Sequence, residues 1–144
     1  MLRHRRVLQA ITVGYLGVVG WITLGPQPLD ERGVGILRSV LAVLARSDLT
    51  RWITYDLVEF AANIAMFVPV GLLFLLLVGP RRWWLALAGG VALTCAIEFA
   101  QIFLPGRFSD VRDILANSVG ALLGVGLGLM LRRADTTATG RLEE

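Results

Sequence analysis

The sequence predicts an all-α integral membrane protein, a polytopic four-transmembrane-helix bundle with a short amphipathic helix in the first outer loop. The chain is 56% hydrophobic over its 144 residues, whereas soluble domains are roughly 45–50% apolar. Its mean hydropathy is +0.68. The apolar residues gather in four runs with few charges. Each has about 18 residues or more, enough to cross about 30 Å of hydrocarbon as a helix.

The four runs are separated by connections that contain charged residues, glycine and proline. They extend from Val7 to Leu24, from Leu57 to Val78, from Trp83 to Leu104 and from Ile114 to Leu131. Basic residues precede the first run, as in a signal peptide, but Gly25 and Pro26 follow it in place of a small-residue cleavage site. We therefore expect the first run to be retained as a membrane span.

The long connection between the first two runs contains a different helical pattern. Apolar residues recur at helical spacing, with polar or small residues opposite: Val34, Leu37, Val40, Leu41 and Leu44 against Arg38, Ser39, Ala42 and Arg46. This pattern predicts a short amphipathic helix. Two placements remain open for it, on the outer surface of the membrane or packed over the mouth of the bundle as a cap.

The arginines predict which side of the membrane each connection occupies. Clusters at residues 3–6, 81–82 and 132–133 fall on one side if the chain crosses four times. Short loops rich in arginine stay in the cytoplasm, so we expect both termini to be cytoplasmic, with residues 134–144 as a short tail. The other two connections balance their arginines with acidic residues and are expected outside.

Strongly polar residues fall in one leaflet of the three later spans and in the connection before the last one. Within each run their spacing of three or four residues puts them on one helix face. Because a carboxylate that faces lipid is costly, we expect these faces to turn inward and form an outward-facing ligand-binding site. The candidate site residues are Glu59, Asn63, Glu98, Gln101, Arg107, Asp110, Asp113 and Asn117.

Two arginines in this region, Arg107 and Arg112, are expected to pair with the candidate carboxylates Glu59, Glu98, Asp110 or Asp113. The plainer interpretation is that the polar residues only join the helices. Interhelical hydrogen bonds in membranes contribute about 0.6 kcal/mol on average, which makes carboxylates a costly means to that end and favours a functional site. Asp113 has its own alternative as an N-cap of the fourth helix.

A stripe of small residues marks the fourth run as a packing surface. Ala116, Gly120, Gly124 and Gly128 recur every four residues. Small residues at this spacing let the backbones of two membrane helices approach closely. We expect this stripe to face another span.

The residue inventory excludes several kinds of chemistry. His4 is the one histidine in the sequence, and it lies on the expected cytoplasmic side, far from the carboxylates. Neither a histidine-containing zinc site nor a Ser-His-Asp triad can therefore be assembled there, and we expect no metal and no cofactor. Nucleic acid is not an expected partner, because the arginines sit at the ends of apolar runs rather than along one stripe.

Carboxylate and arginine chemistry remains. Glu59 and Glu98 near hydrocarbon are candidates for acid/base catalysis. A guanidinium beside them suits a phosphate or carboxylate group on a ligand. The expected partners are the lipid bilayer and a lipid-linked or anionic envelope ligand, such as a wall precursor or an anionic phospholipid.

At these residues the chain resembles the VanZ-like family of bacterial membrane proteins. One matching pattern is Asn63, Phe67, Pro69 and Gly71; the other is Glu98, Gln101, Arg107, Asp110, Asp113, Asn117, Gly120 and Gly124. The motifs lie within residues 56–128 of a four-span domain expected over residues 1–133. The resemblance implies a multi-pass protein of the bacterial cell membrane. The family's founding member is associated with low-level resistance to the glycopeptide teicoplanin.

Three functional hypotheses follow from the residues and the resemblance. The first is a protein that binds an envelope lipid or a glycopeptide-type ligand and contributes to glycopeptide resistance, with Glu98 and Arg107 as polar anchors. The alternative is a membrane-embedded enzyme that acts on a lipid-linked envelope substrate through Glu59 or Glu98. The third is a small structural membrane partner whose polar residues form a seam between helices.

Overall fold

The computed structural model describes residues 2–25, 39–44, 46–105 and 109–140. These residues form α1 (Leu2–Leu24), α3 (Tyr55–Val78), the short 3-10 helix η1 (Pro80–Arg82), α4 (Trp83–Gln101) and α5 (Val111–Gly140). Four of the helices are long and apolar enough to cross a membrane. A further short helix at residues 39–44 lies between the first two of them. The predicted fold class is thus confirmed.

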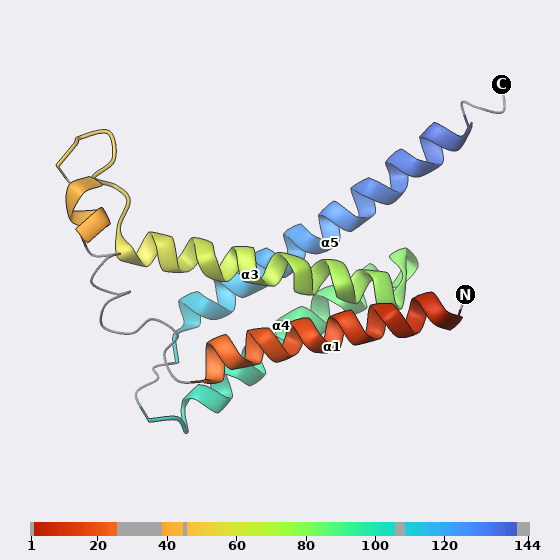
Figure 1. Cartoon of the computed structure of the whole chain (residues 1–144), viewed down its shortest axis with the longest axis horizontal. Helices are drawn as coiled ribbons and strands as arrows, with labels where there is room; N and C mark the ends of the chain where they lie inside the picture. The colour runs from red at the N-terminus through yellow and green to blue at the C-terminus, as the bar shows by residue number, and fades with distance from the viewer. Residues whose placement is uncertain (1, 26–38, 45, 106–108, 141–144) are drawn as a thin grey trace.

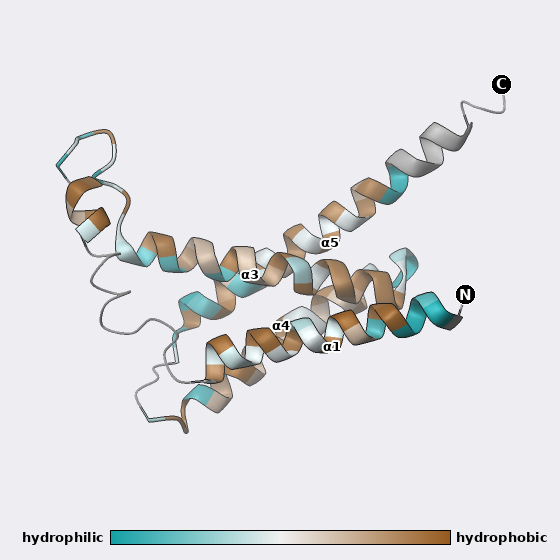
Figure 2. Cartoon of the chain, in the orientation of Figure 1, coloured by the Kyte–Doolittle hydropathy of each residue, from teal (hydrophilic) through white to brown (hydrophobic). Residues whose placement is uncertain are grey.

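The four long helices run alternately up and down the bundle (Figure 1). The start of α1, η1 and the last turns of α5 lie toward one end. The chain turns from α1 to α3 and from α4 to α5 at the other, which we call the loop end. In Figure 2 the middle of each span is mainly apolar, and hydrophilic residues gather at the first turns of α1 and at the loop end of α3 and α5.

The ends of α3 are set by local signals in the sequence. Thr54 has an extended backbone before the helix, and its hydroxyl accepts a hydrogen bond from the amide of Leu57, so it is the N-cap. At the other end Gly79 has a φ of 85°, which is a left-handed conformation that glycine adopts without steric cost. Its amide bonds to the carbonyl of Leu75. The chain can then reverse through η1 into α4.

Close backbone contact joins α3 and α5, which make the most extensive contact of any helix pair in the described residues. A Cβ added at Gly124 would collide with the backbone of Val68, and one added at Gly120 would collide with the backbone of Ile64. From the facing helix, Gly71 approaches the backbone of Ala121 in the same way. The predicted packing stripe on the fourth span is confirmed, because only glycine permits this approach.

The buried core lies where all four spans meet. One cluster contains Phe67 and Val70 from α3, Val19 from α1 and Ile97 from α4, and a second contains Leu75 from α3 with Val125 from α5. The hydroxyl of Tyr15 donates a 2.8 Å hydrogen bond to the carbonyl oxygen of Met66 and ties α1 to α3. Many large apolar residues of the spans are exposed, as expected of helices whose outer faces contact lipid.

Three helices, α1, α3 and α5, begin before the apolar runs that predicted them, at Leu2, Tyr55 and Val111. Two helices also end at other residues than expected. The third span ends at Gln101 and not at Leu104, because residues 102–104 turn ahead of Pro105, and a residue before proline disfavours helix. The fourth span ends later than expected. Helix α5 continues to Gly140, so residues 134–140 of the expected tail are helical. Hydropathy detects where a helix leaves the hydrocarbon, and not where its hydrogen bonding stops.

The placement of the short helix favours one of its two alternatives. Residues 39–44 lie beyond the start of α3, on the side away from α1 and α4 (Figure 1). The helix therefore does not cover the mouth of the bundle. The predicted residues Val34, Leu37 and Arg38 lie outside the described residues.

Candidate functional site

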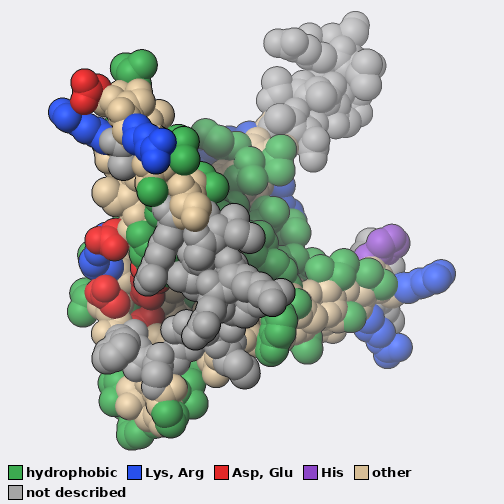
Figure 3. All heavy atoms as spheres, turned by 60° about the vertical axis from the view of Figure 1, so that its left-hand side comes forward, with side chains coloured by type: hydrophobic (Ala, Val, Ile, Leu, Met, Phe, Trp, Pro, Cys, Tyr) green, Lys and Arg blue, Asp and Glu red, His purple; other side chains and the backbone are tan. Residues whose placement is uncertain are grey.

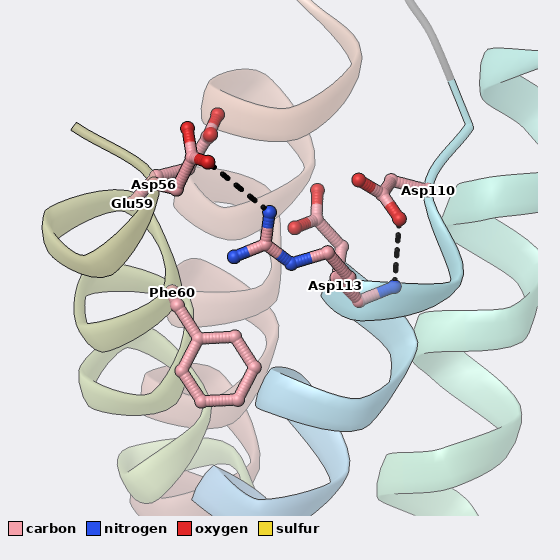
Figure 4. Close-up of a pocket in the computed structure, with 6 residues that line it drawn as sticks. Asp56, Glu59, Phe60, Asp110 and Asp113 are labelled. Atoms are coloured by element: carbon pink, nitrogen blue, oxygen red, sulfur yellow. Dashed lines mark hydrogen bonds and ion pairs between the residues drawn. The ribbon is translucent and has the colours of Figure 1, made fainter. Parts of the chain in front are cut away.

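An acidic pocket opens at the loop end between the first turns of α3 and α5. It contains about 190 Å³ of space, including solvent at its open mouth. Figure 4 shows the side chains converging from the two helices, and Figure 3 shows acidic groups gathered on this face of the molecule. The lining residues are Asp56, Glu59, Phe60, Asp110, Arg112 and Asp113.

Asp110 shapes the start of α5. Its carboxylate oxygen Oδ1 accepts a 2.8 Å hydrogen bond from the amide of Arg112, and its backbone carbonyl accepts one from the amide of Asp113. These are the bonds of an N-cap, which satisfies amides that have no partner within the helix. The alternative that made Asp113 the N-cap was wrong, because the cap lies three residues earlier, but the Asp113 carboxylate does lie in the first turn of α5, at the positive end of the helix.

Asp113 instead contacts the neighbouring span. Its Oδ1 accepts a 2.7 Å hydrogen bond from Nδ2 of Asn63 on α3. The same carboxylate lines the pocket. The two helices are therefore joined directly beside the pocket by two of the predicted site residues.

Arg112 has a different partner from those expected. Its guanidinium lies 3.5 Å from Oδ2 of Asp56, and both side chains are largely exposed. The expectation that the Arg112 side chain pairs with Glu59, Glu98, Asp110 or Asp113 is thus corrected. Its guanidinium pairs with Asp56, the second residue of α3, and only its backbone amide bonds to Asp110. An exposed pair of this kind contributes little to stability, so the guanidinium can exchange Asp56 for a ligand at small cost.

Glu98 holds the connection between α4 and α5. It is only 3% exposed, and its Oε2 accepts a 2.8 Å hydrogen bond from the amide of Asp110. The side chain of Ser109 also hydrogen-bonds to this carboxylate. Glu98 therefore positions Asp110, a lining residue, although it does not line the described pocket itself.

Gln101 and Asn117 make buried bonds between helices. Nε2 of Gln101 donates a 3.0 Å hydrogen bond to the carbonyl of Thr23 on α1. Nδ2 of Asn117, which is 2% exposed, donates a 2.9 Å bond to the hydroxyl of Thr94 on α4. Among the described residues, the buried side-chain oxygens of both amides have no hydrogen-bond partner.

The structure thus divides the candidate residues into two sets. Glu59, Asp110 and Asp113 line the pocket, whereas Asn63, Glu98, Gln101 and Asn117 hold the helices and the connection around it. Arg107, the remaining candidate, lies outside the described residues. Its role as a polar anchor and its pairing with a carboxylate stay predictions.

Two residues that line the pocket, Asp56 and Phe60, were not among the predicted site residues, although their spacing in the sequence indicates them. Asp56, Glu59, Phe60 and Asn63 recur at helical spacing on one face of α3. Thr94, the partner of Asn117, was also not predicted, although it lies one turn before Glu98 on the same face of α4. Thr23, in contrast, accepts through its backbone carbonyl, and a backbone acceptor leaves no trace in a sequence.

The electrostatics of the pocket are dominated by carboxylates. Four of the six lining residues are acidic, and Arg112 is the one cation among them. Within the described part of the chain, no three His, Cys, Asp or Glu side chains are placed to share a metal ion. Carboxylates accept hydrogen bonds and a guanidinium donates them, so the lining can pair with donors and with anionic groups.

Four apolar spans, polar bonds between them and a pocket at one end define a multi-pass integral membrane protein. The chain belongs to the VanZ/LLP1 family, whose model matches residues 12–132. That match includes all the candidate site residues. Neither the curated proteins nor the solved structures that were compared with the chain include a match.

Proposed function

We propose that this VanZ/LLP1 family protein binds an envelope lipid or a glycopeptide-type ligand through a polar group held in the acidic pocket, and that binding contributes to glycopeptide (teicoplanin) resistance. The observation that carries the proposal is the pocket itself. Intramembrane carboxylates are costly and are retained chiefly for function. Here Glu59 and Asp113 open toward a shared space and are not sealed within the bundle.

The lining favours particular groups on the ligand. Carboxylates accept hydrogen bonds, so Asp56, Glu59, Asp110 and Asp113 match amines and hydroxyls. The guanidinium of Arg112 matches a phosphate or carboxylate on the same ligand. A zwitterionic or hydroxyl-rich anionic group carries both features.

The size of the pocket limits what it holds. The 190 Å³ includes open solvent at the mouth, so the enclosed space is far smaller than the roughly 300–1,000 Å³ of pockets that enclose a drug-sized molecule. The pocket can therefore contact one polar group of a larger ligand at its mouth rather than enclose a head group. The remainder of the ligand stays in the membrane or in solution.

The surrounding residues have supporting roles in this proposal. Glu98 positions Asp110 through its amide, and Asn63 positions Asp113. Arg107, which occupies one of the positions that match the family's pattern, would supply a second contact to an anionic group. Gln101 and Asn117 join α4 to α1 and α5, which favours for these two residues the structural role that was the third hypothesis.

The test compares two pocket variants with one control. Glu59→Gln and Arg112→Gln remove lining charges, whereas Asp48→Asn removes a charge from a side chain that is 90% exposed outside the pocket. Loss of one charge-assisted bond of about 1.5–3 kcal/mol weakens binding about tenfold or more. Lipids retained by the purified full chain are identified by mass spectrometry, and teicoplanin susceptibility is measured in bacteria that express each variant.

We expect the two pocket variants to retain less of one lipid class or to restore teicoplanin susceptibility, at unchanged protein level in the membrane. The Asp48→Asn variant should behave as the unaltered chain. If both pocket variants keep the same lipids and the same susceptibility, the pocket is not the binding site. Product formed from a retained lipid by the purified protein would instead support the enzyme hypothesis.

A further inference from the structure

The chain just before α3 folds into a small unit of its own, which we call the surface segment (residues 39–44 and 46–54). The carbonyl of Leu44 accepts a 2.6 Å hydrogen bond from the hydroxyl of Thr50 and a 3.3 Å bond from the amide of Ser47. The amide of Arg51 donates a 2.9 Å bond to the carbonyl of Ser47. These bonds fold the turn residues back onto the end of the short helix.

This folded unit presents apolar side chains outward. Leu49 is 84% exposed, Trp52 is 64% exposed and Val43 is 61% exposed. Val40 lies one turn before Val43 on the same exposed helix face. Removing apolar surface from water is the main favourable term in folding. The surface segment leaves these four apolar side chains exposed, so contact with an apolar phase such as lipid would stabilise it.

Trp52 is held in a defined orientation. Its indole Nε1 donates a 2.8 Å hydrogen bond to the carbonyl of Leu49. The bond satisfies the one polar atom of the side chain and leaves the ring free to contact acyl chains. Tryptophan is enriched where a membrane meets water because its ring combines an apolar body with one polar group.

Charged side chains accompany the apolar ones. Arg46 and Arg51 are exposed, and Arg51 pairs with Asp48 at 3.0 Å. Arginine beside exposed aromatic and aliphatic side chains is the composition of segments that lie in the head-group layer, where the guanidinium meets lipid phosphates.

The position of the surface segment along the bundle axis matches the head-group layer of the membrane. Trp52 precedes Thr54, which caps α3, and the apolar span begins at Tyr55. In Figure 1 the segment extends beyond the start of α3 and sideways from the bundle, away from α1 and α4. Exposed Trp21 lies at the same end on α1.

We propose that the surface segment is an interfacial anchor, which inserts its exposed apolar side chains, Val40, Val43, Leu49 and Trp52, between the lipid head groups of the loop-end leaflet. The partner is the lipid surface beside the bundle. The anchor fixes the start of α3 and Asp56 at head-group level, with Glu59 one turn further into the span. The inference does not depend on what the pocket binds.

The experiment measures which phase each side chain contacts. The cysteine at position 95 is exposed, so a Cys95→Ala background is used for the single variants Val43→Cys and Leu49→Cys. The matched control is Asp48→Cys, at a charged and exposed position in the same unit. Each full-length variant is labelled with a nitrobenzoxadiazole fluorophore and placed in nanodiscs of phosphatidylethanolamine and phosphatidylglycerol.

Two quenchers distinguish the phases. Lipids with a nitroxide at a shallow acyl position should quench positions 43 and 49 several-fold more than aqueous iodide does, with the reverse order at position 48. Equal iodide quenching at positions 43, 48 and 49 would show that the segment stands in water and would overturn the proposal. Protection of positions 43 and 49 from both quenchers would also overturn it, since protein and not lipid would then cover them.

Discussion

Asn63 and Asp113 are 50 residues apart in the chain, yet Nδ2 of Asn63 donates a 2.7 Å hydrogen bond to Oδ1 of Asp113 across α3 and α5. The contact lies next to the pocket that Asp113 lines. Asp113 lies two turns before Gly120 on α5, and a Cβ added at Gly120 would collide with the backbone of Ile64, the residue after Asn63. Close glycine packing and one charge-assisted bond thus fix the same helix pair, and they hold the acidic side chains at a set separation.

Asn63→Ala should destabilise the bundle, because it leaves the carboxylate of Asp113 without this donor. A hydrogen bond to a charged group contributes about 1.5–3 kcal/mol in proteins, and interhelical bonds in membranes average about 0.6. We expect a loss of about 1 kcal/mol in the free energy of unfolding in mixed micelles. Ala62→Ser, at the exposed neighbouring position, is the control and should have no such effect.

The glycine contact between α3 and α5 can be tested with a matched pair on one helix. At Gly124 an added Cβ would collide with the backbone of Val68, whereas at Gly126 it would meet nothing within 4 Å. Gly124→Ala should cost about 1–3 kcal/mol of unfolding free energy through overpacking. Gly126→Ala should leave stability unchanged or slightly higher, because alanine favours helix. Equal stability of the two variants would show that the close approach is absent.

Glu98 should control the order of the connection that follows α4. Its carboxylate accepts the amide of Asp110, so Glu98→Leu leaves that amide without its acceptor. Amide hydrogen exchange at Asp110 should become about tenfold faster or more, in line with loss of a charge-assisted bond. Glu98→Gln retains an acceptor oxygen of the same reach and should change the exchange much less. Unaltered exchange in Glu98→Leu would mean that the bond does not hold the connection.

Much of the fold could be predicted because it follows from local properties of the chain. Span length and charge depletion identify the four helices. The four-residue spacing of Gly120 and Gly124 identifies the packing face of α5. The cost of a lipid-facing carboxylate correctly predicted that Glu98 would be buried inside the bundle.

The partners within the candidate site could be predicted less well, since they depend on the rotation of each helix about its axis. Glu98 and Gln101 share one face of α4, yet one bonds toward α5 and the other toward α1. Arg112 pairs with Asp56, which sits only one turn before Glu59. A long side chain can reach any of several acceptors this close together. The spacing of the acceptors in the sequence does not predict which one it bonds.

The orientation of the bundle in the membrane is the remaining prediction, and positive charge is its basis. Arg81 and Arg82 are exposed at the end opposite the pocket, and arginine-rich short loops stay in the cytoplasm. In a Cys95→Ala background, Ser109→Cys should therefore react with a membrane-impermeant maleimide added to intact cells. Pro80→Cys, beside the arginines, should react only after the membrane is permeabilised. The opposite pattern would put the pocket on the cytoplasmic side, where an envelope ligand on the outer surface could not reach Glu59.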